Sequence, residues 1–168
     1  AKKFTGRRQI IAARKAYHGS TQGALSLIGN EDYHHAYAPL LPEISFINFG
    51  AIADLDLITT ETAAVIIEPI QGEAGVRVPT AAYMQALRAK GSEMGTLLSV
   101  VEIPTRCGRT GKMFAFEQFG MVPDVLMLAK GIGGGMPLGA FVAPKHVMDV
   151  FKDNPMLGHI TTFGGHPV

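Results

Sequence analysis

Short apolar segments recur along the chain, separated by longer stretches of mixed composition. Most of them are continuous runs rather than alternating apolar and polar positions. Continuous runs are typical of strands that are covered on both faces, as in parallel sheets. We therefore predict six strands, at residues 9–13, 44–49, 63–67, 97–101, 125–129 and 139–143.

The segment between the third and fourth runs has the pattern of a helix. Apolar residues recur at helical spacing from Tyr83 to Met94, Thr80 is suited to cap the start, and Gly95 is suited to end it. Weaker patterns predict helices at 20–28, 51–58, 113–119 and 145–151. Strands that alternate with helices indicate an α/β domain with a mainly parallel sheet flanked by helices.

Composition and charge argue against several classes of protein, among them nucleic-acid-binding, membrane-spanning and disulfide-rich proteins. The chain has 168 residues, 47% of them hydrophobic and 17% charged, with a formal net charge of +1. The length alone predicts one domain, and the near-neutral charge gives no reason to bind nucleic acid or an anionic membrane. No apolar run approaches the ~20 residues of a membrane helix. Cys107 is the only cysteine, so we expect no disulfide and no cysteine-based zinc site, and a reducing compartment such as the cytoplasm.

The residues that follow the predicted strands are the candidates for chemistry, because ligands of parallel α/β folds bind beyond the carboxyl ends of the strands. Lys130 directly follows the fifth run and leads into a glycine-rich loop. A desolvated lysine there would have a lowered pKa and could form a Schiff base with a carbonyl group. The alternative is a lysine whose side chain extends from the strand end to solvent.

Two motifs resemble nucleotide-binding sites but lack residues or spacing that such sites require. Gly111-Lys112 would need a glycine at Arg106 and a Ser or Thr at Met113 to form a phosphate-binding loop. The glycine cluster at 131–135 lacks the spacing of a dinucleotide fingerprint and leads into a strand rather than a helix. The six histidines show no metal-pair spacing with an acidic partner, so we predict no metal site and expect most of them at the surface or in turns.

An ordered set of motifs covers nearly the whole chain and resembles the class III aminotransferases, which include the ornithine and acetylornithine enzymes. The motifs are Tyr17-His18-Gly19, Glu68-Pro69-Ile70-Gln71-Gly72-Glu73, Gly108-Arg109-Thr110-Gly111-Lys112, Pro123-Asp124, Ala129-Lys130-Gly131 and Thr161-Thr162-Phe163-Gly164-Gly165. The resemblance implies a large domain of the aspartate-aminotransferase type (fold type I), a pyridoxal 5'-phosphate cofactor and a homodimer with active sites at the subunit interface.

The resemblance also implies roles for particular residues. Lys130 would hold the cofactor as an internal aldimine and move the proton during amino transfer. Tyr17, in the motif that also carries His18, matches the aromatic residue that stacks on the cofactor ring. Thr162 matches a hydroxyl that reaches the cofactor phosphate from the neighbouring subunit. Glu73 matches a glutamate on the substrate side, although a solvated loop glutamate is the alternative.

Two other matched positions, Arg109 and Glu68, we expect to hold the architecture rather than take part in chemistry.

The chain departs from the family in the stretch after the fourth run, which here reads Val101-Glu102-Ile103-Pro104-Thr105-Arg106. The family has an aspartate where Val101 stands, and that aspartate pairs with the protonated ring nitrogen of the cofactor. It has a glutamine where Pro104 stands. Glu102 is one position along, so on a strand it faces the other side and cannot substitute.

The resemblance therefore predicts a partial large domain over residues 1–168, with an N-terminal segment and a C-terminal small domain absent from this chain. The function it implies is amino-group transfer between ornithine, acetylornithine or another ω-amino donor and a 2-oxo acid. The alternative is a non-catalytic fragment or inactive homologue that keeps the fold, because Val101 and Pro104 replace the usual side chains.

Overall fold

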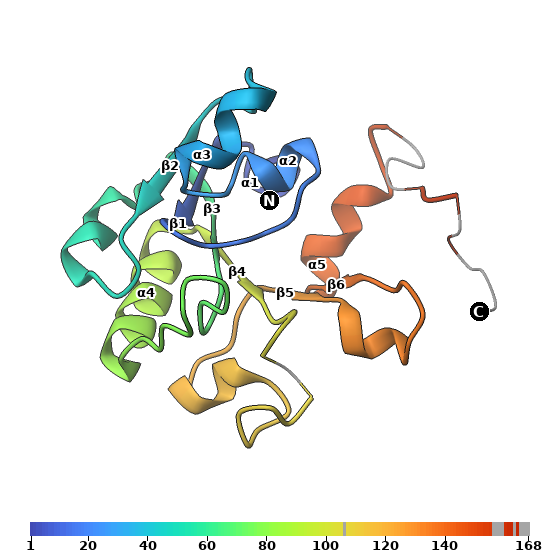
Figure 1. The fold of residues 1–168 in the computed structure, drawn as a ribbon. Coiled ribbons are helices and arrows are strands. Elements are labelled where there is room, and N and C mark those ends of the chain that lie inside the picture. The colour runs from blue at the N-terminus through green and yellow to red at the C-terminus, as the bar shows by residue number, and fades with distance from the viewer. Residues whose placement is uncertain (106, 156–159, 163, 165–168) are drawn as a thin grey trace.

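The described part of the chain is organised around one six-stranded sheet. The computed structural model describes residues 1–105, 107–155, 160–162 and 164. The strands lie in the order β2-β1-β3-β4-β5-β6; β1 to β5 are parallel, and β6 pairs antiparallel with β5 (Figure 1). Their bounds are β1 Gln9–Ala13, β2 Ile44–Ile47, β3 Thr62–Ile67, β4 Leu97–Val101, β5 Val125–Leu128 and β6 Ala140–Val142. All six strands agree with the prediction to within two residues at each end, which confirms the mainly parallel α/β sheet.

The predicted amphipathic helix is α4 (Ala81–Met94). The Thr80 hydroxyl oxygen accepts a hydrogen bond from the backbone N–H of Tyr83 at 3.2 Å, as an N-cap does. Gly95 ends the helix with φ +64°, a left-handed conformation that glycine adopts without strain. Tyr83 and Leu87 are fully buried against the sheet, so α4 covers one of its faces.

The weaker helical patterns form only short helices of about one or two turns. The four predicted segments contain α2 (Gln22–Leu25), 3₁₀ turns at Ile52–Leu57 and Ala115–Phe119, and α5 (Lys145–Met148) continued by a 3₁₀ turn at Asp149–Phe151. Further single turns lie outside the predicted segments: α1 (Lys2–Thr5), α3 (Glu31–His34), and 3₁₀ turns at His35–Tyr37 and Lys130–Gly133. A helix this short buries too few side chains to show a helical period in the sequence.

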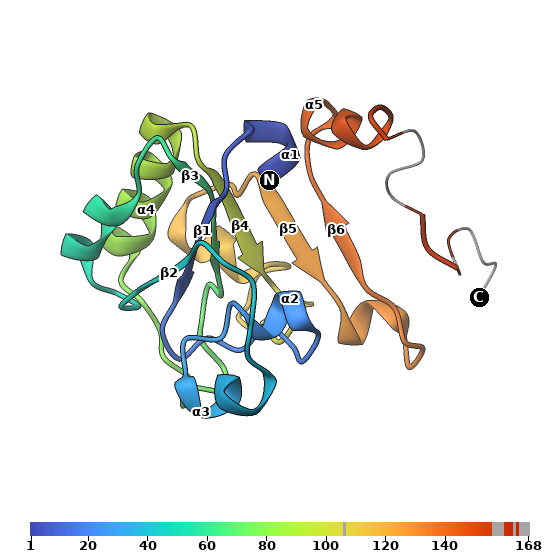
Figure 2. The same ribbon diagram turned by 90° about the horizontal axis from the view of Figure 1, so that it is seen from above.

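The two faces of the sheet are packed differently. On the α4 face, side chains of the parallel strands form the main core with α4 and the turn at 115–119. On the opposite face lie α1 and α5, drawn above the sheet in Figure 1 and across the top in Figure 2. Beneath them is an apolar hollow of about 490 Å³, lined in part by Ile66, Val125, Met127 and Phe141. This second face is less completely filled than the first.

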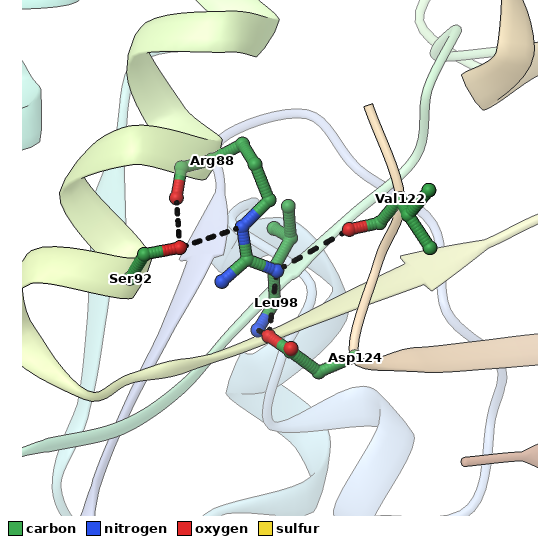
Figure 3. Close-up of polar contacts among 5 residues, drawn as sticks. All are labelled: Arg88, Ser92, Leu98, Val122 and Asp124. Atoms are coloured by element: carbon green, nitrogen blue, oxygen red, sulfur yellow. Dashed lines mark hydrogen bonds and ion pairs between the residues drawn. The ribbon is translucent and has the colours of Figure 1, made fainter. Parts of the chain in front are cut away.

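A polar network centred on Asp124 joins α4 to the amino ends of β4 and β5 (Figure 3). The Asp124 carboxylate accepts hydrogen bonds from the Leu98 backbone N–H and from the Arg88 guanidinium, each at 2.7 Å. The guanidinium also donates to Ser92 Oγ at 3.2 Å and to the Val122 carbonyl at 3.4 Å. The Pro123-Asp124 motif therefore has a structural role here. It lies at the amino ends of the strands, whereas the candidate site residues follow the carboxyl ends.

No helix of the described residues is both long and apolar enough to span a membrane.

Candidate active site

A cavity of about 210 Å³ opens at the carboxyl ends of the strands, on the sheet face opposite α4. Five of the six site residues predicted from the sequence line it, together with residues that follow β3 and β4. The lining is Tyr17, His18, Gly19, Glu68, Glu73, Val101, Ile103, Pro104, Ala129 and Lys130. The larger apolar hollow on the same face holds no histidine or carboxylate among its lining residues, whereas the smaller cavity holds both.

The sixth predicted residue, Thr162, is exposed and does not line this cavity. Arg106, together with Phe163 and Gly165 of the last motif, lies outside the described residues, as do His159 and His166.

Lys130 lies just beyond β5 and begins a 3₁₀ turn. Its φ of +52° is left-handed, a conformation that costs a non-glycine residue about 1–2 kcal/mol. Strain of this kind is often found where a side chain is aimed at a functional site. Lys130 is exposed in the structure, which differs from the desolvated amine considered above, so burial does not by itself activate it.

A second hollow of about 250 Å³ adjoins the same lysine, and Arg109 is among its lining residues.

The ring nitrogens of His18 are buried, although the residue as a whole is only partly so. Among the described residues, neither of its ring nitrogens has a hydrogen-bond partner, and both are shielded from solvent. Burial lowers the pKa of His18 from 6.5 to about 4, so the ring is neutral at physiological pH. An unsatisfied buried polar group calls for an explanation, and a ligand in the cavity that this ring lines would provide one. His18 is thus an exception to the surface positions expected for most of the histidines.

Glu68 lies in the lining of the cavity, although the role expected for it was to hold the architecture. It is 3% exposed, and its carboxylate accepts hydrogen bonds from the backbone N–H groups of Tyr17 at 3.3 Å and Gly72 at 3.5 Å. Burial raises the pKa of Glu68, while these hydrogen bonds and the charge of Lys130 act in the opposite direction. The two backbone contacts agree with the expected architectural role. Because Glu68 also lines the cavity, it could in addition contact a bound ligand.

Val101 presents an apolar side chain to the cavity, and Glu102 does not replace it. Glu102 is fully buried on the other side of β4, where its carboxylate accepts hydrogen bonds from the Phe116 N–H at 2.8 Å and from the Thr105 hydroxyl. Burial raises the pKa of Glu102. The side assigned to Glu102 from strand alternation is therefore correct.

The comparison with known protein families agrees with this geometry, because the model of the aminotransferase class-III family matches residues 1–168. The chain belongs to the class III aminotransferases. It is 43% identical over its whole length to a [LysW]-aminoadipate semialdehyde/glutamate semialdehyde transaminase of Sulfolobus acidocaldarius, and covers 43% of that protein. It is also 43% identical to an acetylornithine aminotransferase of Methanopyrus kandleri, again covering 43% of the relative.

Solved class III structures show the same fold. An ornithine aminotransferase from Toxoplasma gondii superposes on 94% of the chain with a TM-score of 0.86 and 32% identity, and the chain covers 37% of it. Structures of this kind are transaminases of fold type I, so the fold expected from the resemblance is confirmed. The chain thus spans less than half the length of these relatives.

Class III aminotransferases use pyridoxal phosphate, and the cavity fits that group in most respects. Lys130 provides an amine, Tyr17 an aromatic ring, and His18 two unpartnered ring nitrogens on one cavity wall. The exception is at Val101, where an apolar side chain stands in place of the carboxylate that pairs with the ring nitrogen in the family.

Proposed function

We propose that this protein transfers an amino group between an amino donor, such as ornithine, acetylornithine or another ω-amino compound, and a 2-oxo acid. The observation that carries the proposal is the placement of Lys130 in a cavity shared with Tyr17 and His18 at the carboxyl ends of the strands of a class III aminotransferase. The relatives named above are transaminases, which favours this function over an inactive homologue.

Each cavity residue has a role in the proposed reaction that follows from its chemistry. Bound pyridoxal phosphate supplies the carbonyl group and the electron-accepting ring. Lys130 is placed to hold the cofactor through its Nζ and to carry a proton at that atom. Tyr17 packs on the ring, and Glu73, which is exposed at the cavity mouth, faces the substrate. His18 keeps a neutral ring against the bound group.

The wider assembly is part of the same proposal. The chain is the central part of a large domain over residues 1–168, with an N-terminal segment and a small domain contributed by the rest of the protein. The protein is a cytoplasmic homodimer, and Thr162 of the partner subunit binds the cofactor phosphate. The exposure of Thr162, away from its own chain's cavity, supports that arrangement.

The test is the absorbance of the full-length protein after addition of pyridoxal phosphate. We expect a visible band that Lys130→Ala abolishes and that changes when ornithine or glutamate is added. Lys90→Ala is the matched control, because Lys90 lies on α4, on the opposite face of the sheet, and pairs only loosely with Asp56 at 4.0 Å. A band that survives Lys130→Ala would contradict the proposal.

A further inference from the structure

Glu68 and Val101 are neighbours across two paired strands. β3 and β4 are parallel, with Ala64 opposite Leu97 and Ile67 opposite Val100. Extending the same register by one residue places Glu68 opposite Val101, so the two side chains point to the same face of the sheet. Both are 3% exposed, and both line the cavity that contains Lys130. Val101 thus lies between Met127 of β5 and Glu68 after β3, so one of its two strand neighbours is an acid.

The Glu68 carboxylate is incompletely compensated where it lies. Its two backbone hydrogen bonds, at 3.3 and 3.5 Å, are at the long end of the range, and the positive charge that acts on it is that of Lys130. A buried carboxylate is costly without a charged partner or close hydrogen bonds. A cationic group bound in the cavity would be attracted by the Glu68 carboxylate. Its positive charge would in turn lower the free-energy cost of burying that carboxylate.

The other candidates at this cavity are less suitable. Glu73 is the second carboxylate of the lining, but it is exposed in the loop after β3 and is screened by solvent. Glu102 faces the opposite side of β4. His18 is neutral and brings no negative charge.

We infer that Glu68 is the acidic partner of the cofactor's ring nitrogen in this protein, taking from β3 the role that an aspartate at Val101 has in the family. The inference rests on the proposed function. It explains how a class III aminotransferase can keep a cationic ring with valine at the end of β4. It also gives Glu68 a role in cofactor binding besides its two backbone contacts.

The experiment measures the ring nitrogen directly, by ¹⁵N NMR of the full-length protein loaded with pyridoxal phosphate labelled at that nitrogen. We expect a protonated nitrogen in the wild type and a shift toward the neutral value in Glu68→Gln. Loss of a charge-assisted hydrogen bond should also weaken cofactor binding about tenfold or more. Glu102→Gln is the matched control, since it removes a buried carboxylate one residue from Val101 on the opposite face, and the chemical shift should not change.

A second substitution tests whether Glu68 acts through its charge or only by holding the backbone at Tyr17 and Gly72 in place. In the Glu68→Gln background, Val101→Asp should restore both the protonated nitrogen and the affinity. If Glu68→Gln alone binds no cofactor, the double variant still decides: binding with a protonated nitrogen supports the inference, and failure to bind overturns it.

An unchanged chemical shift in Glu68→Gln, or a neutral nitrogen in the wild type, would also overturn the inference. In either case a Lys130-dependent visible band would leave the proposed function standing, whereas absence of that band in the wild type would overturn both.

Discussion

At the level of single residues, His18 links the cavity to the stability of the protein. Its ring is buried with no hydrogen-bond partner for either nitrogen among the described residues, and it shares the cavity with Glu68, Glu73 and Lys130. Because its pKa falls from 6.5 to about 4 on folding, the unfolded chain binds a proton at a pH where the folded chain does not. Protonation of this histidine therefore favours unfolding.

We expect the cofactor-free protein to lose stability as the pH falls from about 6.5 to about 4, in part through His18. The contribution is fully present above pH 6.5 and is of the order of 3 kcal/mol when lost. In His18→Gln the free energy of unfolding, measured by urea denaturation, should fall less over this interval. Glu68 and Glu102 titrate in both proteins, so their contributions cancel in the comparison.

His35→Gln serves as the control for this measurement, because His35 is exposed. It should leave the pH dependence as in the wild type. Equal pH profiles for wild type and His18→Gln would show that this ring is protonated as readily in the folded protein as in the unfolded chain.

Sequence reasoning identified most of this cavity, since Tyr17, His18, Glu73, Val101 and Lys130 all line it. What it missed depends on tertiary pairing. The burial of the carboxylate after β3 and its position opposite Val101 follow from the β3/β4 register, which no local pattern encodes.

The exposure of Lys130 agrees with the alternative given for it, a lysine whose side chain extends from the strand end to solvent. Its left-handed conformation could not be predicted, because this residue type gives no signal of positive φ.

At the level of elements, the strands and the places of the five predicted helical segments agree with the sequence patterns, whereas four further helical turns of the described residues were not predicted. The two strands at the middle of the sheet, β3 and β4, are buried at every position, so their sequences are almost continuously apolar. α4 could be predicted because it has both a capping residue and a buried face. The remaining helices are short and held by their surroundings, and their sequences carry little periodicity.

One carboxylate joins three of these elements, and its removal should be costly. In Asp124→Ala the Leu98 N–H and the Arg88 guanidinium both lose their 2.7 Å acceptor, and Arg88 is only 19% exposed. We expect a loss of about 2–3 kcal/mol in the free energy of unfolding, because the Leu98 N–H is left unpaired and the guanidinium loses its charged partner while keeping Ser92 and Val122. Thermal and urea denaturation measure the effect.

Asp56→Ala is the matched control for this element. Asp56 also faces a cation of α4, but at 4.0 Å and with a side chain 92% exposed, so its removal should change stability by less than about 0.5 kcal/mol. Equal losses in the two variants would mean that the Asp124 network contributes no more than a surface ion pair.

At the level of the whole molecule, the two faces of the sheet differ in what covers them. α4 and the main core fill one face, while the other leaves an apolar hollow near the amino ends of the strands and the Lys130 cavity near their carboxyl ends. Parallel sheets are covered on both faces in stable α/β proteins. The length alone predicted one domain. The chain corresponds to less than half the length of its relatives, so the length of this sequence is not a guide to the number of domains in the protein.

The proposed dimer makes a prediction that only the whole assembly can meet. If Thr162 of the partner subunit binds the cofactor phosphate, each site combines Lys130 from one chain with a hydroxyl from the other. Lys130→Ala should abolish the visible band of the loaded protein, and Thr162→Ala should weaken cofactor binding.

A heterodimer of one Lys130→Ala chain and one Thr162→Ala chain, purified through two different tags, would then contain about one intact site, because both substitutions fall in the other site. Titration of the heterodimer with pyridoxal phosphate should give roughly half the wild-type band at wild-type affinity. A heterodimer that binds only with the weakened affinity of Thr162→Ala would mean that this threonine acts within its own chain. The geometry of the single chain favours the first outcome, because Thr162 does not line the cavity that holds Lys130.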